Sequence, residues 1–235
     1  ERPTIIIGHT VMGRGCVKAD GSCFEGQCST HGQPLSASGA DYAATMRNLG
    51  ADPENPWVIF EDVKALYEAR REQLREIVKT RRAEQAAWEA ANPELAKELN
   101  AFLNNKLPEI DWAAIPHKPN IASRQASADV LGVLAEKVNN MIVSSADLAN
   151  SDKTDAFLKK THPFVKGDFS GAFLHAGVTE LTMASVMNGI ALHGGVIGAC
   201  GTFFVFSDYM KPAVRMAALM ELPVKYIWTH DAFRV

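Results

Sequence analysis

The sequence predicts an α/β fold: a mostly parallel sheet with helices on both faces, preceded by a largely helical partial domain. Apolar segments of strand length lie at 141–144, 196–202 and 224–229, and segments with helical periodicity separate them. Parallel strands need such helical crossovers, and strands that are buried on both faces are apolar throughout. The helical part is predicted by apolar residues at three- and four-residue spacing between 61 and 106, where charged residues take the opposite positions.

In the first half of the chain, the apolar run 4–8 is expected to form a short buried strand that leads into a long loop. From Glu61 onward, apolar residues at three- and four-residue spacing indicate a helix that carries Arg, Lys and Glu on the opposite side. The tripeptide 92–94 (Asn-Pro-Glu) offers an N-cap side chain, a proline at the first helical position and an acid in the first turn, so another helix begins there. Its inner face is expected to consist of Leu95, Leu99, Phe102 and Leu103. The segment 111–120 contains two prolines and is interpreted as a linker.

In the second half, helices are expected over 122–139, 178–193 and 206–220. The helix 178–193 has apolar or small residues on nearly every face, which predicts that it is buried, and Gly194-Gly195 ends it. Ligands of parallel sheets gather at the carboxyl ends of the strands. The residues that directly follow the predicted strands are therefore candidates for a site: Asp147, Ser151, Phe203, Phe206 and His230.

Composition restricts the class of protein. The length of 235 residues suits one large or two modest domains, and a hydrophobic fraction of 47% provides an ample core. The net charge of −3 gives no basic surface for nucleic acid, and no apolar run is long enough to span a membrane. The chain begins without Met and ends in a loop-like stretch after the strand 224–229, so we expect a piece of a longer protein.

The four cysteines are Cys16, Cys23, Cys28 and Cys200, and the first three lie in one glycine-rich loop. A zinc site is one interpretation, with His31 three residues after Cys28, but the spacings match no C-x₂-C pair. Reduced thiols in a cytosolic protein are the favoured interpretation, and the roles of the first three cysteines stay open.

Glu180 is the one formally charged side chain between Gly171 and Ser207. Burying an ionised carboxylate costs several kcal/mol unless a partner or a proton compensates it, so isolated buried carboxylates are functional candidates. The alternative is a first-turn glutamate that the helix macrodipole stabilises, with solvent on one side. The burial pattern alone leaves both interpretations open.

Eight short segments, in order along most of the chain, resemble the transketolase family, and 51–110 is the least diagnostic stretch. The segments are Ser29–Leu35, Ile121–Ser127, Ser145–Leu148 with Ser151 downstream, His175–Met183, Leu192–Gly195, Thr202–Phe206, Val214–Leu219 and Thr229–Asp231. The resemblance implies a cytoplasmic homodimer of the thiamine-diphosphate-binding fold that moves a two-carbon ketol unit between sugar phosphates. It assigns 1–115 to the C-terminal part of the diphosphate-binding domain and 120–235 to a pyrimidine-binding domain truncated at its C-terminal side.

The resemblance also implies catalytic residues. In the family, thiamine diphosphate becomes a nucleophile when the thiazolium C2 loses a proton to the cofactor's own imino group. A buried glutamate that shares a proton with the pyrimidine favours that tautomer, and Glu180 resembles it, acting across the subunit interface. His31 resembles a histidine that contacts cofactor and substrate hydroxyls and aids proton transfer; the alternative is a loop histidine exposed to solvent.

The cofactor-binding residues implied by the resemblance are mainly aromatic. Phe203, Phe206 and Tyr209 resemble the wall on which the aminopyrimidine stacks, and the alternative for them is core packing. Asp147 resembles a carboxylate on the cofactor or interface side of the Ser-Ala-Asp-Leu turn.

The resemblance further implies that Arg124, Ser151 and His230 bind the phosphate of the sugar phosphate substrate. A guanidinium fork, a hydroxyl donor and an imidazole that can be cationic suit this task. Taken singly, the three have other interpretations: a surface ion pair, a helix or turn cap, and a core histidine.

One feature of the family is missing from the chain. The Gly-Asp-Gly…Asn segment that holds Mg²⁺ and the diphosphate appears nowhere, so we assign no metal ligand and expect these 235 residues alone to be inactive. Two alternatives remain. One is a sister thiamine-diphosphate enzyme, such as a deoxyxylulose-phosphate synthase or a dihydroxyacetone synthase. The other is a non-catalytic α/β interaction module.

Overall fold

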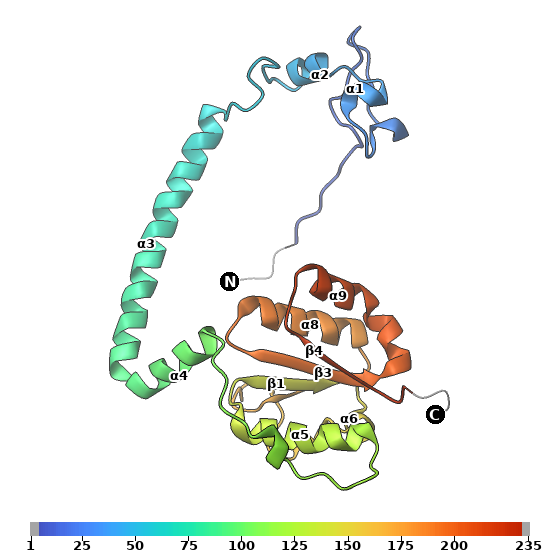
Figure 1. Cartoon of the computed structure of the whole chain (residues 1–235). Coiled ribbons are helices and arrows are strands. Elements are labelled where there is room, and N and C mark those ends of the chain that lie inside the picture. Colours follow the sequence, from blue (N-terminus) through green and yellow to red (C-terminus); the bar gives the residue numbers. More distant parts are fainter. Residues whose placement is uncertain (1–4, 232–235) are drawn as a thin grey trace. The chain divides into compact units, whose positions relative to one another are not determined.

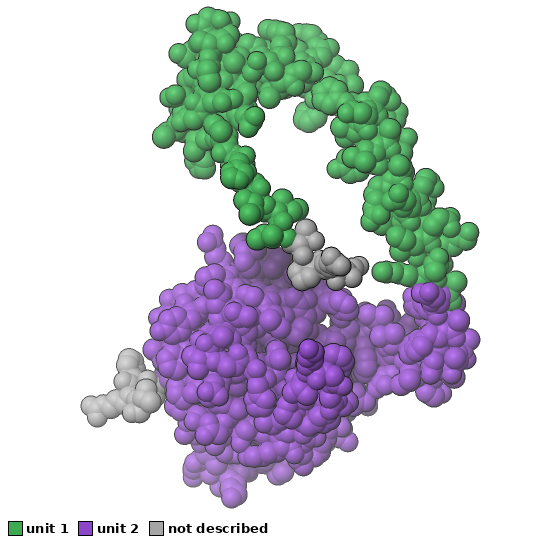
Figure 2. Space-filling model, turned by 180° about the vertical axis from the view of Figure 1, so that it is seen from behind, with its two compact units in different colours: residues 1–83 green, residues 84–235 purple. Residues whose placement is uncertain are grey.

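The computed structural model describes residues 5–231, which divide between two compact units, Glu1–Ala83 and Glu84–Val235 (Figure 2). The first unit contains the short helices α1 (Leu35–Ser38) and α2 (Tyr42–Asn48) and most of the long helix α3 (Glu61–Ala91). The Asp41 side chain caps α2, because it accepts a hydrogen bond from the Ala44 N–H at 2.7 Å.

Two expectations for the first half of the chain are wrong. Ile5, Ile6 and Ile7 form no strand and are 73–90% exposed, because no strand of the described residues lies beside them to complete a backbone ladder. The helix from Glu61 is present, but it has no buried residue, and Leu66 is 69% exposed. The inner face expected for the helix after Asn92 is not formed among residues 5–231, because that helix has no buried residue and Leu95 and Leu103 are 54% and 53% exposed.

The second unit is built on a parallel sheet with the strand order β2-β1-β3-β4. The strands are β1 (Met141–Ser145), β2 (Phe173–His175), β3 (Ile197–Phe203) and β4 (Lys225–Thr229). Val143 pairs with Phe173 on one side of β1 and with Ala199 on the other. The strand order reverses between β1 and β3, and the crevice outside the carboxyl ends at such a point is the usual ligand site of open α/β sheets.

Helices cover both faces of this sheet, as predicted (Figure 1). The helices of this unit are α4 (Pro93–Leu103), α5 (Ser123–Lys137), α6 (Ala149–Asp152), α7 (Asp155–Leu158), α8 (Glu180–His193) and α9 (Ser207–Leu219). Figure 1 shows α5 and α6 on one face and α8 and α9 on the other. The predicted α/β fold is confirmed.

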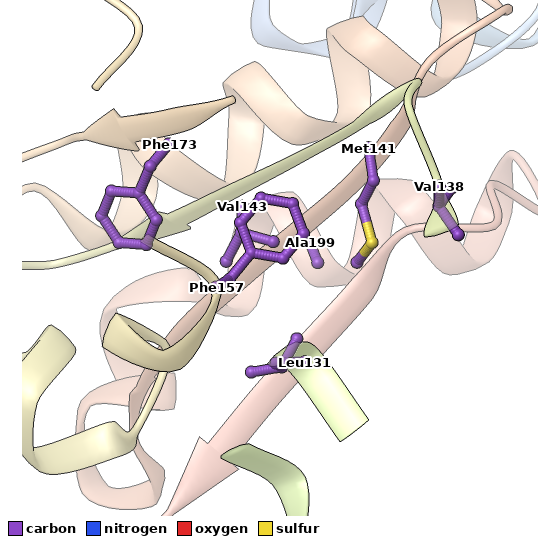
Figure 3. Packing of buried hydrophobic residues seen from close by; sticks show 7 residues of the cluster. All are labelled: Leu131, Val138, Met141, Val143, Phe157, Phe173 and Ala199. Atoms are coloured by element: carbon purple, nitrogen blue, oxygen red, sulfur yellow. The ribbon is translucent and has the colours of Figure 1, made fainter. Parts of the chain in front are cut away.

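Each face has its own apolar core. On the α5 side, Leu131, Phe157 and Phe173 pack together with Val143 of the central strand, and all four are at most 3% exposed (Figure 3). On the other side, Met183 and Met187 of α8 pack against Met210 of α9. Close packing of this kind fixes the strand ends, and with them the loops that carry the candidate residues.

The predicted elements and the observed ones differ in three respects. The short strand β2 was missed, because three residues carry no periodicity. Helix α8 is buried on one face only: Met183 and Met187 lie in the core, whereas Leu192 is 61% exposed. Helix α4 begins where predicted, but the Asn92 side chain donates to the Trp88 carbonyl at 2.9 Å instead of capping α4.

Candidate functional site

A hollow of about 490 Å³ lies at the carboxyl ends of the strands. It is lined by Ala146, Asp147, Leu148, Val178, Glu180, Phe206 and Tyr209. These residues follow β1, β2 and β3 in turn, so the parallel topology brings together three loops that are distant in the sequence.

Glu180 is the first residue of α8, directly after Thr179, and it is 8% exposed. Its carboxylate has no hydrogen-bond partner among residues 5–231, and it lines the hollow beside apolar walls. The first turn of a helix favours a negative charge, so the helix macrodipole contributes to holding the carboxylate there. The two interpretations of Glu180 are therefore compatible: it is both buried and in the first turn.

A row of aromatic rings leads away from this hollow. Phe206 and Tyr209 stack with centroids 6.2 Å apart, and Phe203 and Phe206 stack at 5.8 Å with an angle of 11° between their planes. The His230 ring lies 3.8 Å from Phe203 at the far end of the row. The row arises because β3 ends at Phe203 and the short turn Phe204–Phe206 leads directly into α9.

Arg124, Ser151 and His230 form one cluster at the same edge of the sheet. Arg124 on α5 donates through Nη1 to the Ser151 carbonyl on α6, at 3.4 Å, and to His230 Nε2. A guanidinium has no acceptor, so Nε2 accepts, and the ring proton is assigned to Nδ1, 2.9 Å from Thr229 Oγ1. Burial and then the Arg124 charge lower the pKa of His230, and the Asp152 carboxylate partly opposes them.

The remaining two predicted residues lie at more exposed positions. Asp147 has a left-handed backbone with φ of +63°, which aspartate tolerates, and it is exposed at the rim of the hollow. His31 belongs to the other unit, directly after the turn Cys28–Thr30, and is exposed. The structure thus groups all the predicted site residues except His31 at one edge of the sheet.

Sequence reasoning missed two buried polar residues. Asp152 is fully buried below Ser151, and Asn188 of α8 donates to the Ala213 carbonyl at 2.9 Å and accepts from the Tyr226 hydroxyl. Asp152 stands in a stretch with other polar residues, so no local pattern marks it as buried, whereas Asn188 lies among the apolar residues of a helix that was expected to be buried. Cys200 is also buried, and its pKa is raised to about 12 by burial and by the nearby Asp152.

Comparison with known proteins identifies the family. The family model described as the transketolase thiamine diphosphate binding domain matches residues 1–108, and the one described as the transketolase pyrimidine binding domain matches residues 119–235. The chain belongs to the transketolase family. The resemblance seen in the eight sequence segments is thereby confirmed.

The chain is also similar in sequence to individual transketolases. The chain is 37% identical to the transketolase of Halalkalibacterium halodurans over 239 residues, which cover 100% of the chain and 34% of that relative. It is 36% identical to the Bacillus subtilis transketolase, and this match also covers 100% of the chain and 34% of that relative. The chain thus spans about a third of the length of the curated transketolases that it matches.

Solved transketolase structures share the fold. Transketolase from Leishmania mexicana aligns with a TM-score of 0.76 and 29% identity, over 94% of this chain and 32% of that one. A Pichia stipitis transketolase in complex with sedoheptulose 7-phosphate aligns with a TM-score of 0.74 and 33% identity, over 94% of this chain and 33% of that one.

Two features are absent from the part of the chain that the structure describes. No helix within residues 5–231 combines the length and the apolar character needed to cross a membrane. In the same part of the structure, no three His, Cys, Asp or Glu side chains are grouped so that they can hold a metal ion.

Proposed function

We propose that the protein to which this chain belongs is a transketolase, which moves a two-carbon ketol unit from a ketose phosphate to an aldose phosphate. The chain spans about a third of its relatives, so the activity is proposed for the full-length protein. The observation that supports it most strongly is the hollow at the strand ends, where the buried Glu180 carboxylate lies with the stacked rings of Phe206 and Tyr209.

The lining of the hollow fits the aminopyrimidine of thiamine diphosphate. Such a ring needs an aromatic face to stack on and an acid at a ring nitrogen, and the hollow offers both in a largely apolar setting. When bound, thiamine diphosphate supplies the carbon nucleophile that takes up the ketol unit. Phe203, Phe206 and Tyr209 would hold the ring, and Glu180 would hold a proton at the ring nitrogen, away from bulk water.

The cluster of Arg124, Ser151 and His230 is the proposed site for the phosphate of the sugar phosphates. Because Arg124 already donates to His230 Nε2, a phosphate oxygen can replace that nitrogen as the acceptor. The imidazole can then bind the same phosphate if it takes up a proton at Nε2. The aromatic row connects this cluster with the hollow that Glu180 lines, so the proposed phosphate site and the proposed cofactor site lie at the same edge of the sheet.

Further roles are proposed from the family resemblance. His31 contacts cofactor and substrate hydroxyls and aids proton transfer, and Asp147 lies on the cofactor side. We assign no Mg²⁺ ligand within these 235 residues, so we propose that they are inactive alone. The division into 1–115, from the diphosphate-binding domain, and 120–235, the pyrimidine-binding domain, is also part of the proposal.

We also propose a cytoplasmic homodimer with the cofactor at the subunit interface and no nucleic acid or membrane partner. The exposed apolar side of α8 supports the dimer, because Leu181, Val186 and Leu192 are 40–61% exposed on a helix whose other side is core.

The reaction is tested by assaying the full-length protein with two substrate pairs, each with thiamine diphosphate and Mg²⁺. We expect transfer between xylulose 5-phosphate and ribose 5-phosphate, and none of the condensation between pyruvate and glyceraldehyde 3-phosphate. The second activity in place of the first would instead identify a deoxyxylulose-phosphate synthase. Absence of both would favour a non-catalytic interaction module.

A further inference from the structure

Asp152 is the most completely buried carboxylate of the described residues, and it is saturated with hydrogen bonds. The Ser145 hydroxyl donates to Oδ2 at 2.6 Å, and the Thr154 N–H and hydroxyl donate to Oδ1 at 2.9 and 2.7 Å. Its side chain is fully inaccessible to solvent. A carboxylate with this many donors holds the backbone around it in one geometry, because each bond lost in the interior leaves a polar group unsatisfied.

These bonds connect Asp152 to the framework of the sheet. Ser145 is the last residue of β1, and its Oγ also accepts from the Leu148 N–H at 3.2 Å. On the neighbouring strand β3, Gly201 leaves the space that Asp152 and Thr154 occupy: a Cβ there would lie 2.7 Å from Thr154 Cγ2 and 2.9 Å from Asp152 Oδ2. The last residue of the one-turn helix α6 is thus hydrogen-bonded to the end of β1 and packed against the neighbouring strand β3.

Ser151 immediately precedes Asp152 on α6, and its carbonyl accepts from Arg124. The position of Asp152 therefore fixes both the Ser151 hydroxyl and one of the two acceptors that orient the Arg124 guanidinium. The other acceptor, His230 Nε2, lies on the loop after β4. The whole cluster depends on the α6 turn for its shape.

We propose that Asp152 is the positioning residue of the phosphate cluster, which holds Ser151 and, through the Ser151 carbonyl, Arg124 in place for the phosphate of the sugar substrate. This inference rests on the proposed function, in which the cluster binds phosphate. Asp152 itself is buried below the cluster and makes no contact with substrate. Its effect falls mainly on phosphorylated sugars, because Glu180, Phe206 and Tyr209 lie on α8, on the turn before α9 and on α9, and none of them is hydrogen-bonded to Asp152.

The test uses the full-length protein with Asp152→Ala and compares a phosphorylated sugar with its unphosphorylated form. We expect the KM for xylulose 5-phosphate to rise about 10–100-fold with little change in kcat, as loss of charge-assisted hydrogen bonds predicts. The kinetic constants for unphosphorylated xylulose should stay within about threefold of wild type. Asp152→Asn keeps an acceptor for Thr154 and should recover most of the loss.

Three further measurements keep the test decisive. Ser145→Ala removes one donor to Asp152 and serves as the test variant if Asp152→Ala does not fold. We expect it to raise the KM for xylulose 5-phosphate in the same direction, but by a smaller factor. Asn188→Ala removes a buried polar group on the opposite face of the sheet, and it should lower stability without changing the preference for phosphorylated sugars. Calorimetric binding of ribose 5-phosphate and of ribose reports on the cluster even without turnover.

The outcomes separate the two proposals. Equal losses with both xylulose forms, or no loss in either folded variant, would overturn the role of Asp152. The same holds if wild-type protein binds ribose 5-phosphate no better than ribose. A wild-type protein that binds ribose 5-phosphate in an Asp152-dependent way, yet transfers no ketol unit, would support the positioning role while refuting the proposed reaction.

Discussion

His230 and Arg124 are both cationic groups in their protonated forms, and the structure places them in contact before any phosphate is present. The guanidinium keeps its charge at all ordinary pH values, so the imidazole is the one that gives up its proton. Burial is the main reason why the pKa of His230 lies below its usual value, and the charge of Arg124 lowers it further. A phosphate between the two would reverse this balance.

The pH dependence of substrate capture should show this effect. We measure kcat/KM for xylulose 5-phosphate in the wild type and in His230→Gln, and we expect the wild-type value divided by the variant value to be largest at low pH. It should fall as pH rises through the lowered pKa of His230, below about 6.5, because only the protonated ring attracts phosphate. The phosphate of the substrate also titrates near this pH, but it is common to both enzymes and cancels in the ratio. A ratio that rises with pH would contradict the assignment.

Single residues were predictable where a motif or an unusual context marked them. Glu180 was found because no other charge lies near it in the sequence, and the structure buries it. Asp152 was not, because its neighbours in the sequence are polar and its burial depends on the distant strand β3, where Gly201 leaves space for it. Burial that depends on strand packing cannot be deduced from local sequence.

At the scale of elements, the small residues of β3 decide how closely the helices approach the sheet. Gly198 lies against Met187 of α8 on one face, and Gly201 lies against Asp152 and Thr154 on the other. A larger residue at Gly201 would have to shift the α6 turn, because Asp152 and Thr154 are buried, whereas at Gly198 the flexible Met187 side chain would have to move first.

Gly201→Ala is expected to destabilise the protein by about 1–3 kcal/mol and to weaken binding of phosphorylated sugars. The added Cβ would lie 2.7 Å from Thr154 Cγ2, so the α6 turn must shift. Gly132→Ala is the matched control: it lies within α5 with nothing within 4 Å of the new Cβ. It should stabilise the helix by up to about 1 kcal/mol. Chemical denaturation measures both, and equal stabilities would contradict the packing argument.

Elements were predicted well where length and periodicity agreed. The strands β1, β3 and β4 and the helices α5, α8 and α9 were expected within about two residues of where they lie. Two elements were predicted wrongly. Strand β2 was missed because it is too short for a pattern, and the run at 5–8 is strand-like in sequence but has no neighbouring strand in the described residues. Sequence patterns report the tendency to form an element and not the presence of its partner.

At the scale of the whole molecule, much apolar surface is left uncovered by the described residues. Helix α3 has no buried residue, and one side of α8 is exposed although it is apolar. Contiguous exposed apolar surfaces normally mark contacts with other proteins. The helix of Glu180 was predicted to be buried on all sides, and its exposed side supports the proposal that a second subunit completes both the helix packing and the cofactor site.

The central claim is that Glu180 is the acid that exchanges a proton with the cofactor ring. Glu180→Gln in the full-length protein keeps the size of the side chain and removes the acid, and turnover of xylulose 5-phosphate with ribose 5-phosphate should fall about 10²–10⁴-fold. Glu94→Gln is the control, because Glu94 is also a first-turn glutamate but is exposed on α4. Glu94→Gln should lose a little stability, because a first-turn charge that interacts with the helix macrodipole is removed in both variants, but its turnover should not change. Near-normal turnover in Glu180→Gln would contradict the account.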